Sequence, residues 1–247
     1  YACKCKCYQP EVLGNKSVLG GKNMIFSVER ASLLEAVSKL QRVVGSKTSM
    51  PVLEGILISA ELGKVTLISY NLEMGMKKEI YAKCEEAGDI VVNARLLADI
   101  LRRMNGLQVT IEADDKLNCH IKCGETTFDI MGMAAEDFPE MPTVGSDKTI
   151  VIDADIFSEM VKGTIFAVAQ NEGAKPILTG IYVTIEDRIL RFVAIDGYRL
   201  AIRRHNIDIE GSFSFILSGR AVGEAVKLID EETENVEISF GDRLVSF

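Results

Sequence analysis

The side chains that could take part in catalysis are few in this sequence and lie far apart along it. His120 and His205 are its two histidines, and neither stands at a spacing that is typical of a metal site. The sequence also contains no glycine-rich phosphate loop, no G-x-S-x-G elbow and no H-E-x-x-H motif. We therefore expect no enzymatic activity, no metal and no cofactor, and we assign structural or surface roles to both histidines.

Cysteine is the other residue type with reactive potential, and three of the six cysteines alternate with lysine near the N-terminus, at Cys3, Cys5 and Cys7. A C-x-C-x-C run could bind a soft metal or act in redox chemistry, but it has no partner histidine or second cysteine pair here. Residues 1–23 also have no apolar period. We interpret them as an N-terminal extension outside the folded domains, with Met24 as the natural start.

The remaining cysteines are expected to be reduced and unreactive. Cys119 and Cys123 lie four residues apart in a predicted strand, which separates them by about 13 Å, too far to share one metal ion. Cys84 is interpreted in the same way. Acidic pairs such as Glu85-Glu86 and Asp114-Asp115 fall in predicted turns, where solvation is their expected role.

Composition narrows the class of protein further. The chain has 247 residues, of which 47% are hydrophobic, and this is enough for two cores. No stretch approaches the roughly 18 apolar residues of a membrane helix, and no secretory signal is recognisable, so we expect a cytoplasmic protein with no membrane partner. A net charge of −8 argues against a protein that coats nucleic acid, because such proteins neutralise phosphates with a basic surface. Any contact with DNA must be local or geometric.

An internal repeat organises the elements that position these side chains. Residues 51–76 and 176–202 both indicate strand, tight turn and strand, and they match at a constant offset of 125 residues. The matched pairs are Pro51 with Pro176, Leu53 with Leu178, Gly55 with Gly180, Leu67 with Phe192, and Asn71 with Asp196.

The repeat predicts two copies of an α+β domain, each with two helices on antiparallel sheets. Ser32 and Glu35 have the spacing of a capping box, and Asn93 and Ser218 are N-cap residue types before the second helix of each copy. Apolar periodicity predicts that Leu96 is buried. We expect helices at about 32–44, 94–104, 155–168 and 219–229, strands at 25–28, 52–60, 64–69, 76–82, 107–112, 117–122, 126–132, 150–152, 235–240 and 243–247, and domains at 24–140 and 149–247 joined by a linker at 141–148, the second domain one strand short of the first.

The predicted helices carry more basic than acidic side chains, although the whole chain is acidic. If the helices share one surface, that surface is basic; the alternative is ordinary solvated helix faces of mixed charge. The basic residues are Lys39, Arg42, Arg95, Arg102, Arg103, Lys162, Arg220 and Lys227, and the acidic ones are Glu35, Asp99, Asp155, Glu159 and Glu224.

Four segments together resemble a known family. They are AIDGYRLAI (194–202), PILTG (176–180), YNLEM (70–74) and EDFPEMP (136–142). In this order and spacing they are similar to the beta sliding clamp of bacterial DNA polymerase III, over residues 24–247. The resemblance implies the DNA-clamp fold and a head-to-tail homodimeric ring that encircles double-stranded DNA without reading its sequence. The implied partners are the DNA polymerase III alpha subunit, the clamp loader and other proteins with clamp-binding peptides.

The resemblance also implies site residues in this numbering. The matched pocket for partner peptides consists of Leu178, Ile195, Gly197, Tyr198, Arg199 and Leu200, and further pocket positions of the family fall beyond Phe247. The matched DNA-contacting residues are Lys47, Asn171, Glu172 and Lys175, and Glu172 departs from the family in being acidic. The matched residues of the dimer interface are Phe128 and Ile130, with Glu125 and Thr127 standing where the family can carry basic residues.

Two other classes remain open from the sequence. One is a non-catalytic interaction scaffold of duplicated α+β domains without a DNA role, in which the pocket residues are only a hairpin turn with core leucines. The other is a thiol or metal protein built on Cys3, Cys5 and Cys7.

Overall fold

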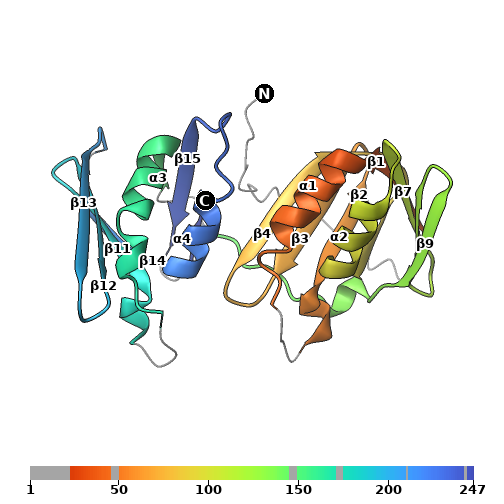
Figure 1. The fold of residues 1–247 in the computed structure, drawn as a ribbon, viewed down its shortest axis with the longest axis horizontal. Helices are drawn as coiled ribbons and strands as arrows, with labels where there is room; N and C mark the ends of the chain where they lie inside the picture. Colours follow the sequence, from red (N-terminus) through yellow and green to blue (C-terminus); the bar gives the residue numbers. More distant parts are fainter. Residues whose placement is uncertain (1–22, 46–49, 145–148, 171–174, 210, 242–243) are drawn as a thin grey trace. The chain divides into compact units, whose positions relative to one another are not determined.

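The repeat appears in the computed structural model as two compact units, which divide between Met141 and Pro142 (Figure 1). The structure describes residues 23–247 except 46–49, 145–148, 171–174, 210 and 242–243. We call residues 23–141 the first unit and residues 142–247 the second unit. The predicted α+β class is confirmed, because each unit packs two α-helices against antiparallel sheets.

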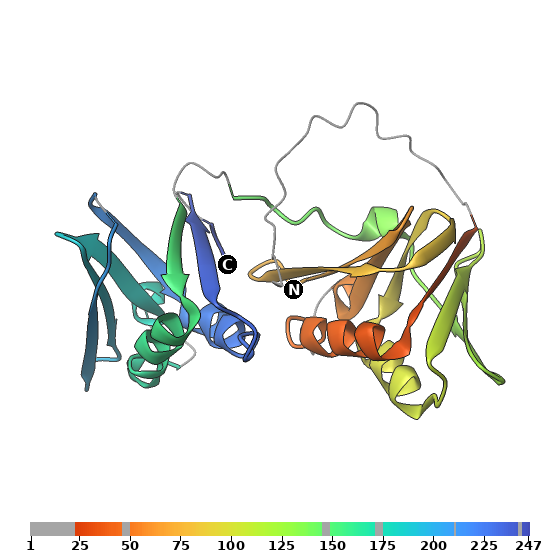
Figure 2. The same cartoon turned by 90° about the horizontal axis from the view of Figure 1, so that it is seen from above.

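The first unit has two sheets, ordered β5-β1-β7-β8-β9 and β4-β3-β2-β6. Its helices α1 and α2 lie side by side against the strands (Figure 2), and their apolar faces enter one buried core. The bounds are β1 Met24–Glu29, α1 Arg30–Leu40, η1 Pro51–Glu54, β2 Gly55–Glu61, β3 Lys64–Tyr70, β4 Gly75–Tyr81, β5 Lys83–Glu86, β6 Gly88–Asn93, α2 Ala94–Arg103, β7 Gln108–Ala113, β8 Asn118–Cys123, β9 Thr126–Met131 and η2 Ala135–Asp137.

The second unit has a separate core and the sheets β10-β15-β16 and β13-β12-β11-β14. One face of the larger sheet is packed against α3 and α4 (Figure 1). The bounds are β10 Thr149–Asp153, α3 Ala154–Lys162, η3 Ile165–Ala167, η4 Pro176–Leu178, β11 Gly180–Glu186, β12 Ile189–Ile195, β13 Leu200–Asn206, β14 Phe213–Ser218, α4 Gly219–Val226, β15 Asn235–Phe240 and β16 Val245–Ser246.

The two four-stranded sheets are copies of each other in strand order and in register. In the first unit Gly55 of β2 faces Asn93 of β6, and in the second Gly180 of β11 faces Ser218 of β14. These pairs are related by the same offset of 125 that the sequence shows. The predicted duplication is therefore confirmed at the level of individual strand pairs.

Several local predictions about the helices are wrong. Helix α1 begins at Arg30 rather than near Ser32, because β1 runs directly into it, and the Ser32 hydroxyl donates to the Glu29 carboxylate at 2.7 Å instead of capping the helix. Asn93 does cap α2, since its side chain accepts from the Leu96 backbone amide, whereas the Ser218 side chain makes no capping bond. Leu96 is 44% exposed, not buried.

The lengths of the second-unit helices also differ from the prediction. Helix α3 ends at Lys162, and the continuing apolar pattern belongs to the short turn η3, because Gly163 and the Thr164 hydroxyl close the helix. Thr164 donates to the carbonyl of Met160 at 2.9 Å. Strands β5, β6 and β14 were not predicted at all.

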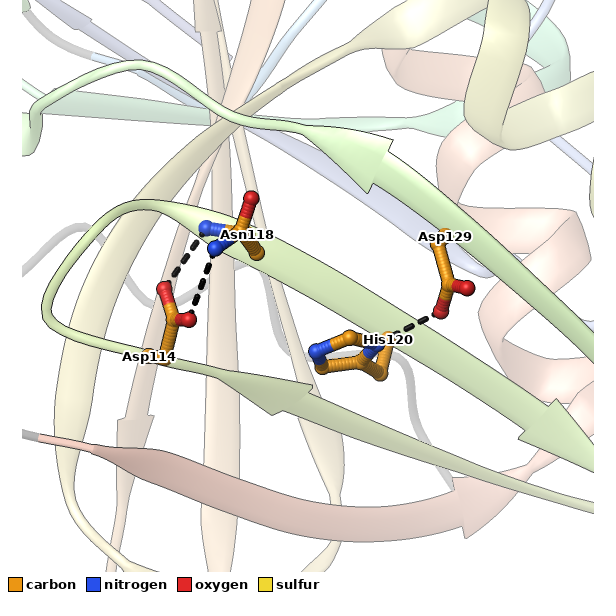
Figure 3. Close-up of polar contacts among 4 residues, drawn as sticks. All are labelled: Asp114, Asn118, His120 and Asp129. Carbon is orange, nitrogen blue, oxygen red and sulfur yellow. Dashed lines mark hydrogen bonds and ion pairs between the residues drawn. The ribbon is translucent and has the colours of Figure 1, made fainter.

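A row of polar side chains crosses the solvent side of the first unit's five-stranded sheet. His120 on β8 lies opposite both Glu112 of β7 and Asp129 of β9, and its Nδ1 is 2.5 Å from an Asp129 oxygen (Figure 3). In the adjoining turn, Asp114 accepts hydrogen bonds from the backbone and side chain of Asn118. The carboxylate partner of His120 could not be predicted from local spacing, because Asp129 reaches the imidazole only across the sheet.

We expect the Asp129 carboxylate to raise the pKa of His120 above its usual 6.5, mainly through their hydrogen bond. A raised pKa in the folded state adds stability that is complete below about pH 6.5 and is lost as the pH rises through the folded-state value. Asp129→Asn should lower the His120 pKa in an NMR titration and flatten this part of the stability profile. An unchanged titration would contradict the pairing; the imidazole signals of His205 serve as reference.

Candidate functional site

The turn between β12 and β13 is fixed by one carboxylate, and we call residues 196–199 the Asp196 turn. One Asp196 oxygen accepts hydrogen bonds from the backbone amides of Tyr198 and Arg199, each at 3.0 Å, and the other accepts from Arg199 Nε at 2.8 Å. These donors, the Tyr198 amide first, lower the Asp196 pKa to about 2, so the group stays ionised at neutral pH. Gly197 has a φ of 91°, which glycine adopts without strain.

This turn presents its side chains outward. Tyr198 is 98% exposed, and the Arg199 guanidinium lies 5.9 Å from the ring centroid of Phe166 in η3. The ion pair with Asp196 and the nearby Phe166 ring restrict the orientation of the guanidinium. It keeps enough exposure, 60% of its side chain, to donate to a bound carbonyl or carboxylate.

Five of the six predicted pocket residues lie in this turn or at the ends of the strands that it joins, and the sixth, Leu178, lies in η4. Ile195 and Leu200 face each other across β12 and β13, and Leu178 ends η4 directly before β11, the next strand of the sheet. Leu178 is half-buried, whereas Leu200 is 59% exposed. Their apolar surfaces and the donors of the turn make a site suited to a peptide rather than to a reaction.

Sequence reasoning missed the extent of this apolar surface. We define the open face as the exposed apolar side chains on the side of the β13-β12-β11-β14 sheet away from α3 and α4, together with Ile177 of η4. Strand register identifies its other members, because Tyr182 pairs with Ile216 on β14 and with Val193 on β12, which in turn pairs with Ile202. The open face consists of Ile177, Tyr182, Ile195, Leu200, Ile202 and Ile216, each between 41% and 63% exposed.

The same face of the first unit is covered by its own chain. Residues 133–141, which we call the connector, pack Phe138 and Met141 against the sheet and pair Met133 with Val91 of β6. Three of the six positions that match the open face are buried: Val52 is 6%, Tyr70 9% and Val91 0% exposed, against 63%, 42% and 41% for Ile177, Ile195 and Ile216.

The Asp196 turn also has a twin in the first unit, at residues 71–74. The Asn71 side-chain oxygen accepts from the amides of Glu73 and Met74 at 3.1 and 2.8 Å, as Asp196 does in its own turn. The Asn71 amide nitrogen donates to the carbonyl of Val43. An asparagine therefore suffices to build this turn, and the carboxylate of Asp196 adds the ion pair with Arg199.

The other predicted site residues are only partly placed. Lys47, Asn171 and Glu172 lie outside the described residues, as does the segment with Cys3, Cys5 and Cys7. Lys175 is exposed at the start of η4. Phe128 and Ile130 lie on the edge strand β9, where both are half-buried and pack against the first unit's core.

In the part of the chain that the structure describes, reactive side chains are not grouped for catalysis or metal binding. Within those residues, histidine, cysteine and carboxylate side chains form no group of three that could hold a metal ion. Burial raises the pKa of the Cys119 thiol to about 12, which keeps it protonated and unreactive. None of the described helices is long and apolar enough to cross a membrane.

The duplicated fold, with two helices packed on antiparallel sheets in each unit, defines a protein of tandem α+β domains of the clamp type. Family models agree: that of the N-terminal domain of the DNA polymerase III beta subunit matches residues 24–142, and that of its central domain matches residues 151–247. The chain belongs to this family, the bacterial beta sliding clamps.

Individual relatives are similar over most of the chain. The Bacillus subtilis beta sliding clamp is 29% identical over 91% of this chain, and that of Micrococcus luteus is 36% identical over 83%. The crystal structure of the B. subtilis clamp matches with a TM-score of 0.85 at 28% identity, over 90% of this chain and 60% of that one. A Pseudomonas aeruginosa clamp bound to griselimycin matches with a TM-score of 0.82 at 25% identity, over 90% and 60%. The chain spans 62% of the length of the B. subtilis relative and 66% of the M. luteus one.

Proposed function

We propose that this chain acts in a ring-shaped processivity factor, which encircles duplex DNA and tethers the replicative polymerase and other DNA-processing proteins through the second unit. The observation that carries the proposal is the group of exposed apolar side chains beside the Asp196 turn, where the Arg199 guanidinium is held by Asp196 and lies near the Phe166 ring. Membership of the beta sliding clamp family supports the proposal, and the griselimycin-bound P. aeruginosa clamp supports a ligand-binding role in the family.

Encirclement explains how an acidic chain can serve a DNA function. A closed ring retains DNA by topology, so tight binding to phosphate is unnecessary, and a tethered polymerase meets the primer end at high effective concentration.

In this proposal Lys47, Asn171, Glu172 and Lys175 lie near the DNA, and Phe128 and Ile130 on the edge strand β9 take part in the homodimer interface. The clamp loader and the polymerase alpha subunit are the expected partners, the protein is not an enzyme, and it works in the cytoplasm.

The peptide-binding role is tested by Leu178→Ala combined with Leu200→Ala. We expect these changes to weaken binding of a polymerase-tail peptide about tenfold or more, because both leucines lose the apolar surface that the peptide would cover. Fluorescence anisotropy measures the affinity, and thermal melting checks that the protein still folds.

The matched control is Leu62→Ala combined with Leu107→Ala, which removes two leucines that are 92% and 89% exposed in the first unit. It should leave peptide affinity unchanged. If the Leu178 and Leu200 variant binds the peptide as well as the wild type, the pocket assignment is wrong.

A further inference from the structure

The side of the β13-β12-β11-β14 sheet that carries the open face changes from apolar to basic along its strands. In antiparallel strands, paired residues point to the same face, and the next row on that face lies two residues further, about 7 Å away. The apolar row is Ile216, Tyr182, Val193 and Ile202, and the next row is Ser214, Thr184, Arg191 and Arg204.

Two arginines are therefore paired directly across β12 and β13 in a chain of net charge −8. Like charges in such a pair repel each other and weaken the sheet. Arg191 is partly neutralised by Glu186 at 3.4 Å, whereas Arg204 is exposed and has no ion pair with another described residue. We call Arg191 and Arg204 the arginine pair.

The fold itself does not require this pair. The positions in the first unit that match Arg191 and Arg204 at the offset of 125 are Thr66 and Glu79, which face each other across β3 and β4. Glu79 is neutralised by Lys77 at 2.9 Å, which lowers its pKa. The same sheet thus forms with or without basic residues there, so formation of the sheet does not depend on the arginine pair.

The connector shows what kind of segment this side of the sheet can accept. In the first unit it places Phe138 and Met141 on the apolar surface, and it carries the carboxylates of Glu136, Asp137 and Glu140 beside them. A segment of that composition on the second unit would bring its apolar side chains to the open face and its carboxylates within reach of the arginine pair.

We propose that the second unit binds an extended peptide in which acidic residues flank the apolar anchors, and that the arginine pair, chiefly Arg204, contacts the carboxylates. This inference rests on the proposed function, because it specifies the chemistry of the peptide that the open face binds. The arginine pair then selects among peptides with similar anchors, and repulsion between the two guanidinium groups is relieved when a carboxylate binds.

The test compares two labelled peptides on the intact chain: residues 134–142, and the same sequence with glutamine or asparagine at its three acidic positions. In low salt we expect the acidic peptide to bind about three- to tenfold more tightly, since exposed ion pairs each contribute little and are screened by salt. Arg204→Gln should abolish this preference, and so should high salt. Arg203→Gln is the matched control, because it removes the same charge one residue along β13 but on the other side of the sheet.

Equal affinity of the two peptides for the wild type would overturn the inference, as would an equal effect of Arg203→Gln and Arg204→Gln, which would indicate only long-range charge. Failure of both peptides to bind would also overturn it. In each case the proposed function is judged separately, by whether the polymerase-tail peptide still depends on Leu178 and Leu200.

Discussion

Replacing Phe157 by alanine should lower the free energy of unfolding of the second unit by about 3–5 kcal/mol, as expected for a large aromatic residue removed from a core. Phe157 on α3 is 0% exposed, and its ring contacts those of Phe192 and Phe247 at centroid distances of 6.2 and 5.8 Å. The loss would combine missing apolar burial with a cavity where three rings meet.

Hydrogen exchange followed by mass spectrometry can measure this effect for each unit separately. Amides of β11 and β12 should lose protection in the Phe157 variant, while those of β1 and β7 should keep theirs, because the two units have separate cores. Phe166→Ala is the matched control: this ring is 53% exposed, so its removal should change protection little. Equal loss of protection in both units would contradict the independence of the cores.

Gly180→Ala is expected to destabilise the second unit by about 1–3 kcal/mol, as overpacking does, and to weaken peptide binding as well. An added β-carbon would lie 2.6 Å from the carbonyl oxygen of Leu217 and 2.6 Å from a methyl carbon of Ile216. Relief requires β11 and β14 to move apart, since one of these neighbours is backbone. That movement would displace Ile216 from the open face.

Chemical denaturation and peptide titration measure the two effects of Gly180→Ala. Gly241→Ala is a suitable control, because its β-carbon would meet only a Val144 methyl carbon at 3.9 Å, an ordinary contact. A Gly180 variant that is as stable as the wild type would show that the strands separate easily, and would contradict the tight pairing of β11 with β14.

Much of the fold could be predicted from the sequence because the repeat shows the same order of helices and strands twice. The match of Gly55 with Gly180 and of Asn71 with Asp196 located both tight turns and the strands beside them. The start of α1 could not be predicted from Ser32, because its position depends on how β1 pairs with β7. Strands β5 and β6 were not predicted, because apolar and polar side chains alternate poorly in them and few residues separate the two strands.

The turn of the candidate site could be predicted from the sequence, but the apolar surface beside that turn could not. Local spacing identified Ile195 and Leu200 on either side of Gly197, but Tyr182 and Ile216 reach the same face only through strand register, which single segments do not reveal. The covering of the matching face in the first unit was also not predicted, because it is a tertiary contact made by Phe138 and Met141.

The burial of Leu53 and the partial exposure of its counterpart Leu178 have a consequence for how the duplicated halves can diverge. Under the proposed function, selection should act on Leu53 through the yield of folded protein and on Leu178 through recognition of partner peptides. The two positions match at the offset of 125, yet they should tolerate different residues. Orthologues that serve different polymerases would then vary together with those polymerases at the second position and not at the first.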